Sequence, residues 1–130
     1  MAQSEIRPEL LQFIRQYIPS VEHLEVLLLV SALPDRSWTV EGIDQVIQSS
    51  VSAVTERVLE LCRQGFLVEH KQEGGAGRYQ FQPNSEELRR LVAELAATYR
   101  ERRVRVIEAI YAPPSPMDEF SRAFRLRKDN

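Results

Sequence analysis

The sequence predicts a mainly α-helical protein with one small β-hairpin. Three observations support this fold class. Apolar residues recur every three to four positions over most of residues 9–64, which is the period of an amphipathic helix. Residues 66–82 instead hold two short strand-like runs joined by a Gly-rich segment. Residues 86–111 return to helical spacing and form a long apolar stripe that a run of prolines ends.

The composition is that of a folded protein rather than a disordered or membrane-spanning chain. Of the 130 residues, 43% are hydrophobic, which is enough for a sizeable core. The longest apolar run, Val26 to Val30, is far too short to cross a bilayer, and the N-terminus lacks an apolar signal-peptide core. Cys62 is the only cysteine, so no intramolecular disulfide can form. We therefore expect a cytoplasmic protein without membrane contact.

Charge is divided unevenly along the chain, whose net charge is −2. Residues 1–65 hold five Arg and no Lys against nine Asp and Glu, whereas residues 66–130 hold 12 Lys and Arg against 10 Asp and Glu. The excess cations fall in the predicted hairpin, in the last helix and in the tail. A basic second half fits a surface that faces phosphates or an acidic partner.

Two helices are predicted in the N-terminal part of the chain. Pro8 suits the first turn of a helix over residues 9–18, and Pro19 ends it. Ser20 is a good N-cap for the second helix, which is apolar nearly all round and is expected at the centre of the core. His23 lies in the first turn of that helix and is expected at the surface or in the cap.

A pair of short helices follows. Trp38 is expected to form a strand of one or two residues and to plug the core. Thr39 caps a helix over residues 40–47, and Ser49 or Ser50 caps a second over residues 51–64. The second helix carries a narrow apolar seam that is expected to be buried. The seam residues are Val51, Val54, Val58 and Leu61.

A hairpin follows the helix pair. Gly65 is expected to end the preceding helix in the left-handed conformation. Strands are predicted over residues 66–72 and 78–82, and the Gly-rich segment between them is expected to turn the chain.

Residues 86–111 are predicted to form one continuous helix, capped by Asn84 or Ser85. About 26 helical residues span nearly 40 Å, more than a domain of this size needs for its own core. Part of the apolar stripe is therefore expected to pair with a second copy of the chain. The stripe comprises Leu88, Leu91, Val92, Leu95, Tyr99, Val106 and Ile110, and a second stripe begins with Val104, Ile107 and Tyr111.

Residues 112–130 are predicted to form a Pro-rich linker and a basic, aromatic tail. Three prolines, at positions 113, 114 and 116, break the helix. The tail then holds three apolar side chains among basic ones, and these are candidates for docking on a protein partner. They are Phe120, Phe124 and Leu126.

The segment SWTVEGIDQVIQSSVSAVTERVLELCRQGFLVEHKQEGGAGRYQF, about a third of the chain, resembles winged helix-turn-helix proteins of the MarR and PadR type. The strongest match is VTERVLELCRQGFL followed by a hairpin. The resemblance implies a winged helix-turn-helix domain over residues 1–84, which includes an N-terminal helix, and a dimerisation helix over residues 85–111. It further implies a transcriptional regulator that binds double-stranded DNA as a homodimer, with half-sites about one helical turn apart.

The resemblance also implies which residues touch DNA. Residues early in the second helix of the pair enter the major groove, and the wing tip, Lys71 to Arg78, reaches an adjacent minor groove or phosphates. Carried over by position, the DNA-binding residues are Ser50, Ser52, Ala53, Thr55, Glu56, Arg57, Lys71 and Arg78. A dimer bound in this way would act as a repressor by blocking or repositioning polymerase.

Two positions depart from the family's pattern. Asp44 falls near the crossing of the two helices, where family members usually carry a small residue. Glu56 stands where DNA binders often have Arg or a neutral polar residue, and its helix is neutral because Arg57 and Arg63 balance Glu56 and Glu60. Winged-helix folds also serve as protein-interaction modules. The alternative function is therefore an adaptor that binds a protein and not DNA.

No other pattern in the sequence indicates chemistry. The glycines within residues 74–77 are not followed by Lys-Ser/Thr or by a helix, so we expect a wing turn rather than a phosphate loop. Cys62, with Arg63 as its one cationic neighbour, is expected to be a small buried or half-buried residue rather than a redox sensor. His23 and His70 are the only histidines, and they indicate neither a zinc site nor a Ser–His–acid triad. We expect no enzymatic activity, no cofactor and no metal.

Overall fold

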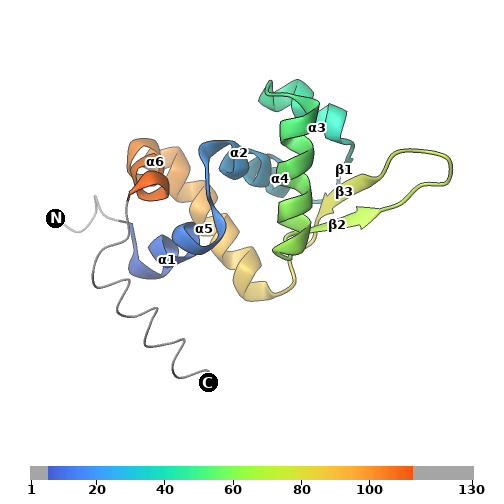
Figure 1. The fold of residues 1–130 in the computed structure, drawn as a ribbon. Coiled ribbons are helices and arrows are strands. Elements are labelled where there is room, and N and C mark those ends of the chain that lie inside the picture. Colours follow the sequence, from blue (N-terminus) through green and yellow to red (C-terminus); the bar gives the residue numbers. More distant parts are fainter. Residues whose placement is uncertain (1–5, 113–130) are drawn as a thin grey trace, which may run out of the picture.

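The computed structural model describes residues 6–112, in which six α-helices and a three-stranded antiparallel sheet follow one another (Figure 1). The order is α1 (Pro8–Tyr17), α2 (Val21–Ala32), β1 (Ser37–Trp38), α3 (Val40–Ile47), α4 (Val51–Arg63), β2 (Leu67–His70), β3 (Arg78–Phe81), α5 (Glu86–Glu101) and α6 (Arg103–Tyr111). The predicted fold class, mainly α with a small β-hairpin, is confirmed. None of these helices is long and apolar enough to cross a membrane. The candidate docking residues Phe120, Phe124 and Leu126 lie outside the described residues.

Side-chain caps begin four of the helices where the sequence predicts them. The Ser20 hydroxyl accepts a hydrogen bond from the His23 amide at the start of α2, and Thr39 does the same for Gly42 in α3. Ser50 rather than Ser49 caps α4, and Ser85 rather than Asn84 caps α5. Each cap satisfies an amide that has no partner inside its own helix.

The sheet has the strand order β1-β3-β2. Trp38 pairs with Tyr79, and its side chain is 2% exposed, so the predicted core plug is confirmed. The β2–β3 ladder ends at the pair His70 and Arg78, which makes both strands shorter than predicted. Beyond that pair the chain enters a turn that projects from the body of the molecule as a wing (Figure 1).

Helix α2 lies at the centre of the core, as its apolar surface predicts. Leu24, Val26, Leu27 and Val30 are all fully buried. Helices α3, α4 and α5 and strand β3 contact α2, and α1 packs on α5 and α6. Burial of these side chains stabilises the fold by about 1.5–3 kcal/mol for each large aliphatic group.

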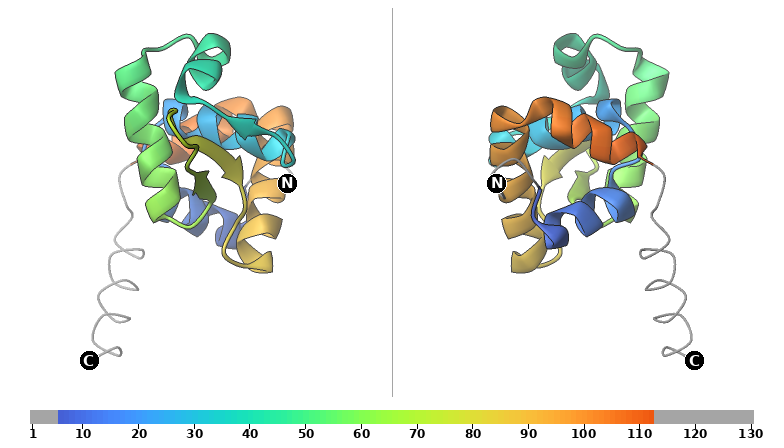
Figure 2. Two further views of the ribbon diagram at one scale, coloured as in Figure 1. Left: turned by 90° about the vertical axis from the view of Figure 1, so that its right-hand side faces the viewer. Right: turned by 90° about the vertical axis from the view of Figure 1, so that its left-hand side faces the viewer.

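The prediction of one continuous helix over residues 86–111 is wrong. The helix breaks at Arg102, whose backbone leaves the helical region at φ −136° and ψ 53°, and α6 starts at the next residue. Leu95 and Val106 would stand about 16 Å apart along a straight helix. The break brings α6 back onto the rest of the chain, so that both residues are fully buried in one core. Figure 2 shows α6 lying beside α1 after this bend.

The stripe predicted to pair with a second copy is therefore part of the intramolecular core. Leu91, Val92, Leu95 and Val106 are at most 6% exposed within the single chain, and Leu88, Tyr99 and Ile110 pack against the same core half-buried. The first four cannot contact a second copy while the chain keeps this conformation. The physical reason is the bend at Arg102, which lets one chain cover its own stripe.

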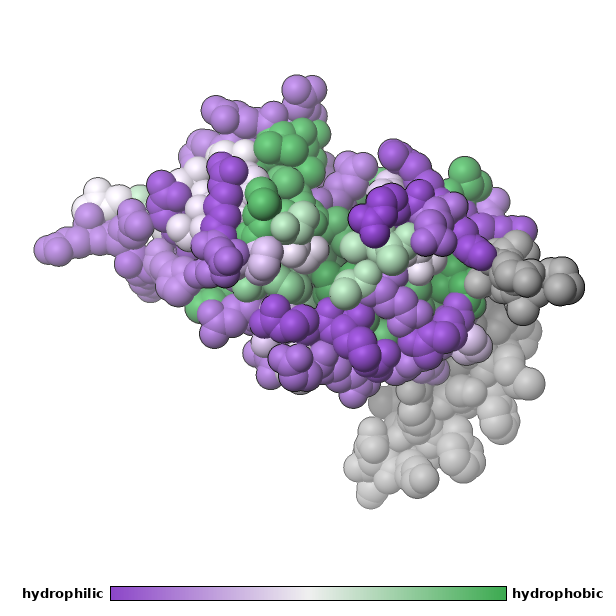
Figure 3. All heavy atoms as spheres, turned by 180° about the vertical axis from the view of Figure 1, so that it is seen from behind, coloured by the Kyte–Doolittle hydropathy of each residue, from purple (hydrophilic) through white to green (hydrophobic). Residues whose placement is uncertain are grey.

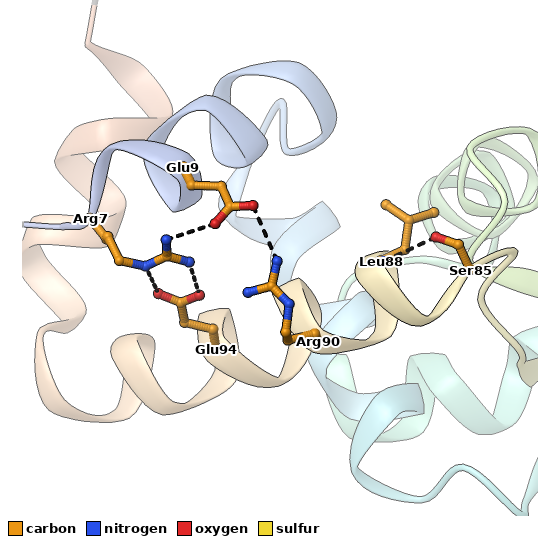
Figure 4. A network of polar contacts seen from close by, with 6 residues as sticks. All are labelled: Arg7, Glu9, Ser85, Leu88, Arg90 and Glu94. Carbon is orange, nitrogen blue, oxygen red and sulfur yellow. Dashed lines mark hydrogen bonds and ion pairs between the residues drawn. The ribbon is translucent and has the colours of Figure 1, made fainter.

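Ion pairs join α1 to α5 at the surface (Figure 4). The Arg7 guanidinium donates to both carboxylate oxygens of Glu94, at 2.5 and 2.8 Å, and to Glu9 at 2.7 Å. Arg90 donates to the other oxygen of Glu9 at 3.1 Å. The Arg7 guanidinium lowers the pKa of both carboxyl groups, and Arg90 adds to this at Glu9. This network holds the N-terminal helix on the core, although exposed pairs of this kind contribute little individually.

Candidate nucleic-acid interface

The connection between α3 and α4 is a tight turn built around Asp44. Gln48 adopts the left-handed conformation at φ 61°, and its amide donates to the Asp44 carbonyl at 2.7 Å. The Asp44 carboxylate accepts from the Ser49 amide at 3.0 Å, and the Ser49 hydroxyl donates to Glu22 on α2. Asp44 is thus a turn-forming residue, which explains why an acid stands near the crossing of the helices.

Helix α4 presents one face to the core and one to solvent. Val54, Val58 and Leu61 are fully buried, as predicted. Val51 is 45% exposed, so its predicted burial is wrong: it is the first residue of α4, where the helix extends past the core. The opposite face carries Ser52, Glu56, Leu59 and Arg63, all exposed. No described segment covers this face, and Figure 1 shows α4 at the front of the molecule beside the wing.

The structure separates the predicted DNA-binding residues of α4 into two groups. Ser50 and Thr55 engage their own backbone: Ser50 caps the helix, and the Thr55 hydroxyl donates to the Val51 carbonyl at 2.7 Å. Ala53 is half-buried. Ser52 and Glu56 instead point to solvent, and 70% of the Glu56 side chain is exposed. Direct contact with a ligand is therefore open chiefly to these two.

Most of the cations on α4 and the wing are less available to contact DNA phosphates than their sequence positions imply. The Arg57 side chain is 25% exposed and its Nη2 lies 4.0 Å from Glu56. Arg63 is paired with Glu60 on the same helix. On the wing, the Arg78 guanidinium donates to the Ser37 carbonyl at 3.1 Å, which ties the hairpin to β1. Lys71, at the start of the wing turn, is exposed and makes no ion pair with the described residues.

Gly65 sets the direction of the wing relative to α4. Its φ of 90° lies in the left-handed region, as predicted. The Phe66 amide returns to the Leu61 carbonyl, and the Asn84 amide donates to the Gly65 carbonyl at 2.8 Å. A single glycine thus joins the end of α4, the first wing strand and the segment that leads into α5.

His23 is fully buried beneath α4, so its expected place at the surface is wrong. The Gln64 amide donates to the Tyr17 carbonyl at 2.9 Å, which leaves the Gln64 oxygen to accept from His23 Nε2 at 3.0 Å. His23 Nδ1 is then the unprotonated nitrogen, and it has no partner among residues 6–112. Gln64, at the end of α4, was not identified from the sequence as a structural residue, because no sequence pattern marks it. Its side chain links α1, α2 and α4 through the hydrogen bonds to Tyr17 and His23.

This environment makes the stability of the protein pH-dependent. Burial lowers the pKa of His23, the charge of Arg57 lowers it further, and the Gln64 hydrogen bond and Glu60 oppose the shift. The unfolded chain takes up the proton near the ordinary pKa of 6.5, whereas the folded chain does so only at lower pH. The free energy of unfolding is therefore expected to fall as the pH drops below 6.5.

The His23→Gln variant removes this titration and keeps a side chain that can donate to Gln64. Urea unfolding at pH 7.5 and at pH 5 measures the effect. The stability loss between the two pH values is expected to be smaller in His23→Gln than in the wild type. His70→Gln is the matched control, because it makes the same replacement at an exposed position on the wing. Equal losses in all three proteins would contradict the assignment.

The described residues hold little that suggests chemistry. Cys62 is half-buried, as expected, and burial raises the pKa of its thiol, which disfavours the reactive thiolate. No group of three or more His, Cys, Asp and Glu side chains in residues 6–112 is placed to hold a metal ion.

Apolar side chains reach the surface at several points. Seen from behind, they gather near α3 and over the middle of the molecule, inside a mostly hydrophilic rim (Figure 3). Within residues 6–112, the large apolar side chains that are exposed are Leu33, Val46, Val51, Leu59, Val104 and Tyr111. Three of them belong to α3 and α4 and two to α6, so the helix pair and the last helix both offer apolar contacts.

These elements define a winged helix-turn-helix domain: α3 and α4 are the helix pair, and β2 and β3 with the turn between them are the wing. No family model matches the chain, and no curated protein does. Solved structures do match. MepR, a transcription regulator of the Staphylococcus aureus multidrug efflux pump MepA, has a TM-score of 0.55 at 14% identity, over 92% of this chain and 87% of that one.

Two further matches agree. The adhesin competence repressor AdcR from Streptococcus pyogenes has a TM-score of 0.52 at 17% identity, covering 88% of this chain and 84% of that one. The PcaV transcriptional regulator from Streptomyces coelicolor, in complex with its natural ligand, has a TM-score of 0.51 at 20% identity, covering 93% of this chain and 80% of that one. The fold of this chain is that of the MarR-type winged-helix regulators, as the sequence resemblance predicts.

Proposed function

We propose that this chain is a DNA-binding transcriptional regulator. The observation that carries the proposal is the uncovered outer face of α4, which lies beside a projecting wing in a fold shared with transcription regulators (Figures 1 and 2). In the proposed complex the outer face of α4 enters the major groove, and the wing reaches phosphates or an adjacent minor groove. No chemical step is involved, because the protein acts by occupying its site.

Binding is expected to depend on salt through a small number of cations. Lys71 is exposed, and Arg57 on α4 and Arg78 on the wing are half-buried. If these three contact phosphates in each of two copies, the slope of log K against log salt is about −5. Gel-shift assays with sheared genomic DNA, at low and at moderate salt, test the proposal. A complex that persists on a minority of fragments at moderate salt supports a sequence-specific regulator. Absence of any complex at low salt would contradict it and leave the adaptor alternative.

We further propose that the regulator acts as a homodimer and represses by blocking polymerase. Since the stripe of α5 is buried, we assign the dimer contact to the outer face of α6. Val104 is 67% exposed and Tyr111 is 61% exposed there, with half-buried Ile107 between them. Two copies joined along α6 by a two-fold axis would present two α4 helices to a palindromic site.

A charge on the outer face of α6 is expected to separate the two copies. Val104→Glu leaves the core intact, because the side chain is exposed, but places a buried carboxylate in the proposed contact. Analytical ultracentrifugation should show a dimer for the wild type and at least a tenfold weaker association for Val104→Glu. Val46→Glu is the matched control, since Val46 is 56% exposed on α3, away from α6. A dimer equally stable in both variants would place the contact elsewhere.

A further inference from the structure

Glu56 occupies the middle of the surface that α4 offers to DNA. Its side chain is 70% exposed. Ser52 lies one turn before it and Leu59 about one turn after it, and both are exposed on the same face. The buried residues Val54 and Val58 lie on the opposite side of the helix. A helix placed in the major groove with its exposed face inward would therefore direct the Glu56 carboxylate at base edges.

No cation within residues 6–112 neutralises this carboxylate closely. Arg57 Nη2 approaches it only to 4.0 Å, and the Arg57 side chain is mostly covered. Arg63 is paired with Glu60 at 2.5 Å, one turn farther along the helix. The carboxylate of Glu56 makes no hydrogen bond with the described residues. Its oxygens can therefore accept from a ligand.

The edges of the four bases differ in how they meet such a group. An ionised carboxylate only accepts hydrogen bonds. Guanine presents two acceptors in the major groove, N7 and O6, and thymine presents O4, so both repel it. Adenine offers its N6 amino group but places the N7 acceptor beside it. Cytosine offers the N4 amino group without a neighbouring acceptor on the same base.

We propose that Glu56 is a specificity-determining residue that selects cytosine in duplex DNA by accepting a hydrogen bond from its N4 amino group. This inference rests on the proposed DNA-binding function. The proposal also accounts for the net charge of zero on α4. The Glu56 carboxylate weakens the attraction of the helix to phosphates on any DNA sequence, and the hydrogen bond to cytosine offsets this loss of affinity only at sites where a cytosine faces Glu56. An exposed carboxylate at this position thus lowers binding to unrelated sequences more than binding to the operator.

The test compares the wild type with Glu56→Gln and Glu60→Gln on randomised duplexes. Gln keeps the size of the side chain and removes its charge, and its amide can donate as well as accept. The wild type should enrich a site with cytosine at one position of each half-site, preferred about fivefold or more over the other bases. Glu56→Gln should lose that preference and bind unrelated DNA more tightly. Glu60→Gln, the matched control, should tighten unrelated binding without changing any base preference.

The outcomes separate the two proposals. In one outcome the wild type enriches a site, and Glu56→Gln binds all variants of that site more tightly by the same factor, whichever base stands at each position. This outcome would overturn the role of Glu56 and leave the regulator proposal standing. Failure of the wild type to enrich any sequence or to bind DNA would overturn both. Nearly equal thermal unfolding of the three proteins is expected, because the Glu56 side chain is 70% exposed and Glu60→Gln removes only a surface ion pair with Arg63. That result excludes a folding defect as the cause.

Discussion

Leu95→Ala is expected to lower the free energy of unfolding by about 2–5 kcal/mol, the range for removing a large buried aliphatic side chain. Leu95 is fully buried where α5 meets the core of the same chain. The loss should appear in urea unfolding as a lower midpoint with an unchanged slope. Leu59→Ala is the matched control, because Leu59 is 42% exposed on α4, and its effect should stay within about 0.5 kcal/mol.

The same variant distinguishes an intramolecular core from a dimer interface. If Leu95 is buried by its own chain, the difference between Leu95→Ala and the wild type should not change with protein concentration. If Leu95 instead contacts a second copy, the difference should grow as the protein is diluted through the dissociation range. A stability difference that increases on dilution would contradict the break at Arg102 that lets α5 and α6 bury Leu95 within one chain.

Gly65→Ala is expected to destabilise the fold by roughly 2–4 kcal/mol and to weaken DNA binding by turning the wing. Two effects combine. An alanine at φ 90° is strained, and its Cβ would lie 2.1 Å from Asn84 Nδ2 and 2.8 Å from Asn84 Cγ. The Asn84 side chain must rotate to make room, while its backbone amide stays hydrogen-bonded to the Gly65 carbonyl. Thermal and urea unfolding measure the stability change, and gel shift measures the binding.

Two further variants divide this effect into its parts. Gly74 also has a positive φ, 69°, but a Cβ there would meet nothing within 4 Å. Gly74→Ala therefore reports the backbone strain alone and should lose only about 1–2 kcal/mol. Adding Asn84→Ala to Gly65→Ala should recover the part caused by the close contact. If Gly65→Ala is no more harmful than Gly74→Ala, the junction tolerates a side chain and does not fix the wing.

Local chemistry in the sequence determined where the helices and strands begin and end. Ser20 and Thr39 cap helices because a hydroxyl beside free amides satisfies them at short range. Gly65 ends α4 because only glycine adopts φ 90° without strain. The helix–helix–hairpin order then predicts the winged helix, and the match with MepR and AdcR agrees. None of these features requires knowledge of distant contacts.

Only the tertiary structure decided which apolar and polar side chains are buried. Residues 86–111 have the helical period throughout, so their sequence does not mark a break at Arg102; the break arises because the rest of the chain can bury Val106 once α6 folds back. His23 looks like a first-turn surface residue until Gln64, 41 positions away, is placed beside it. Glu56 is exposed and Arg57 mostly covered because α4 docks on α2 through one particular face. The helical period of the sequence determines which residues form an apolar stripe on a helix. Which part of the protein covers that stripe depends on segments far away in the chain.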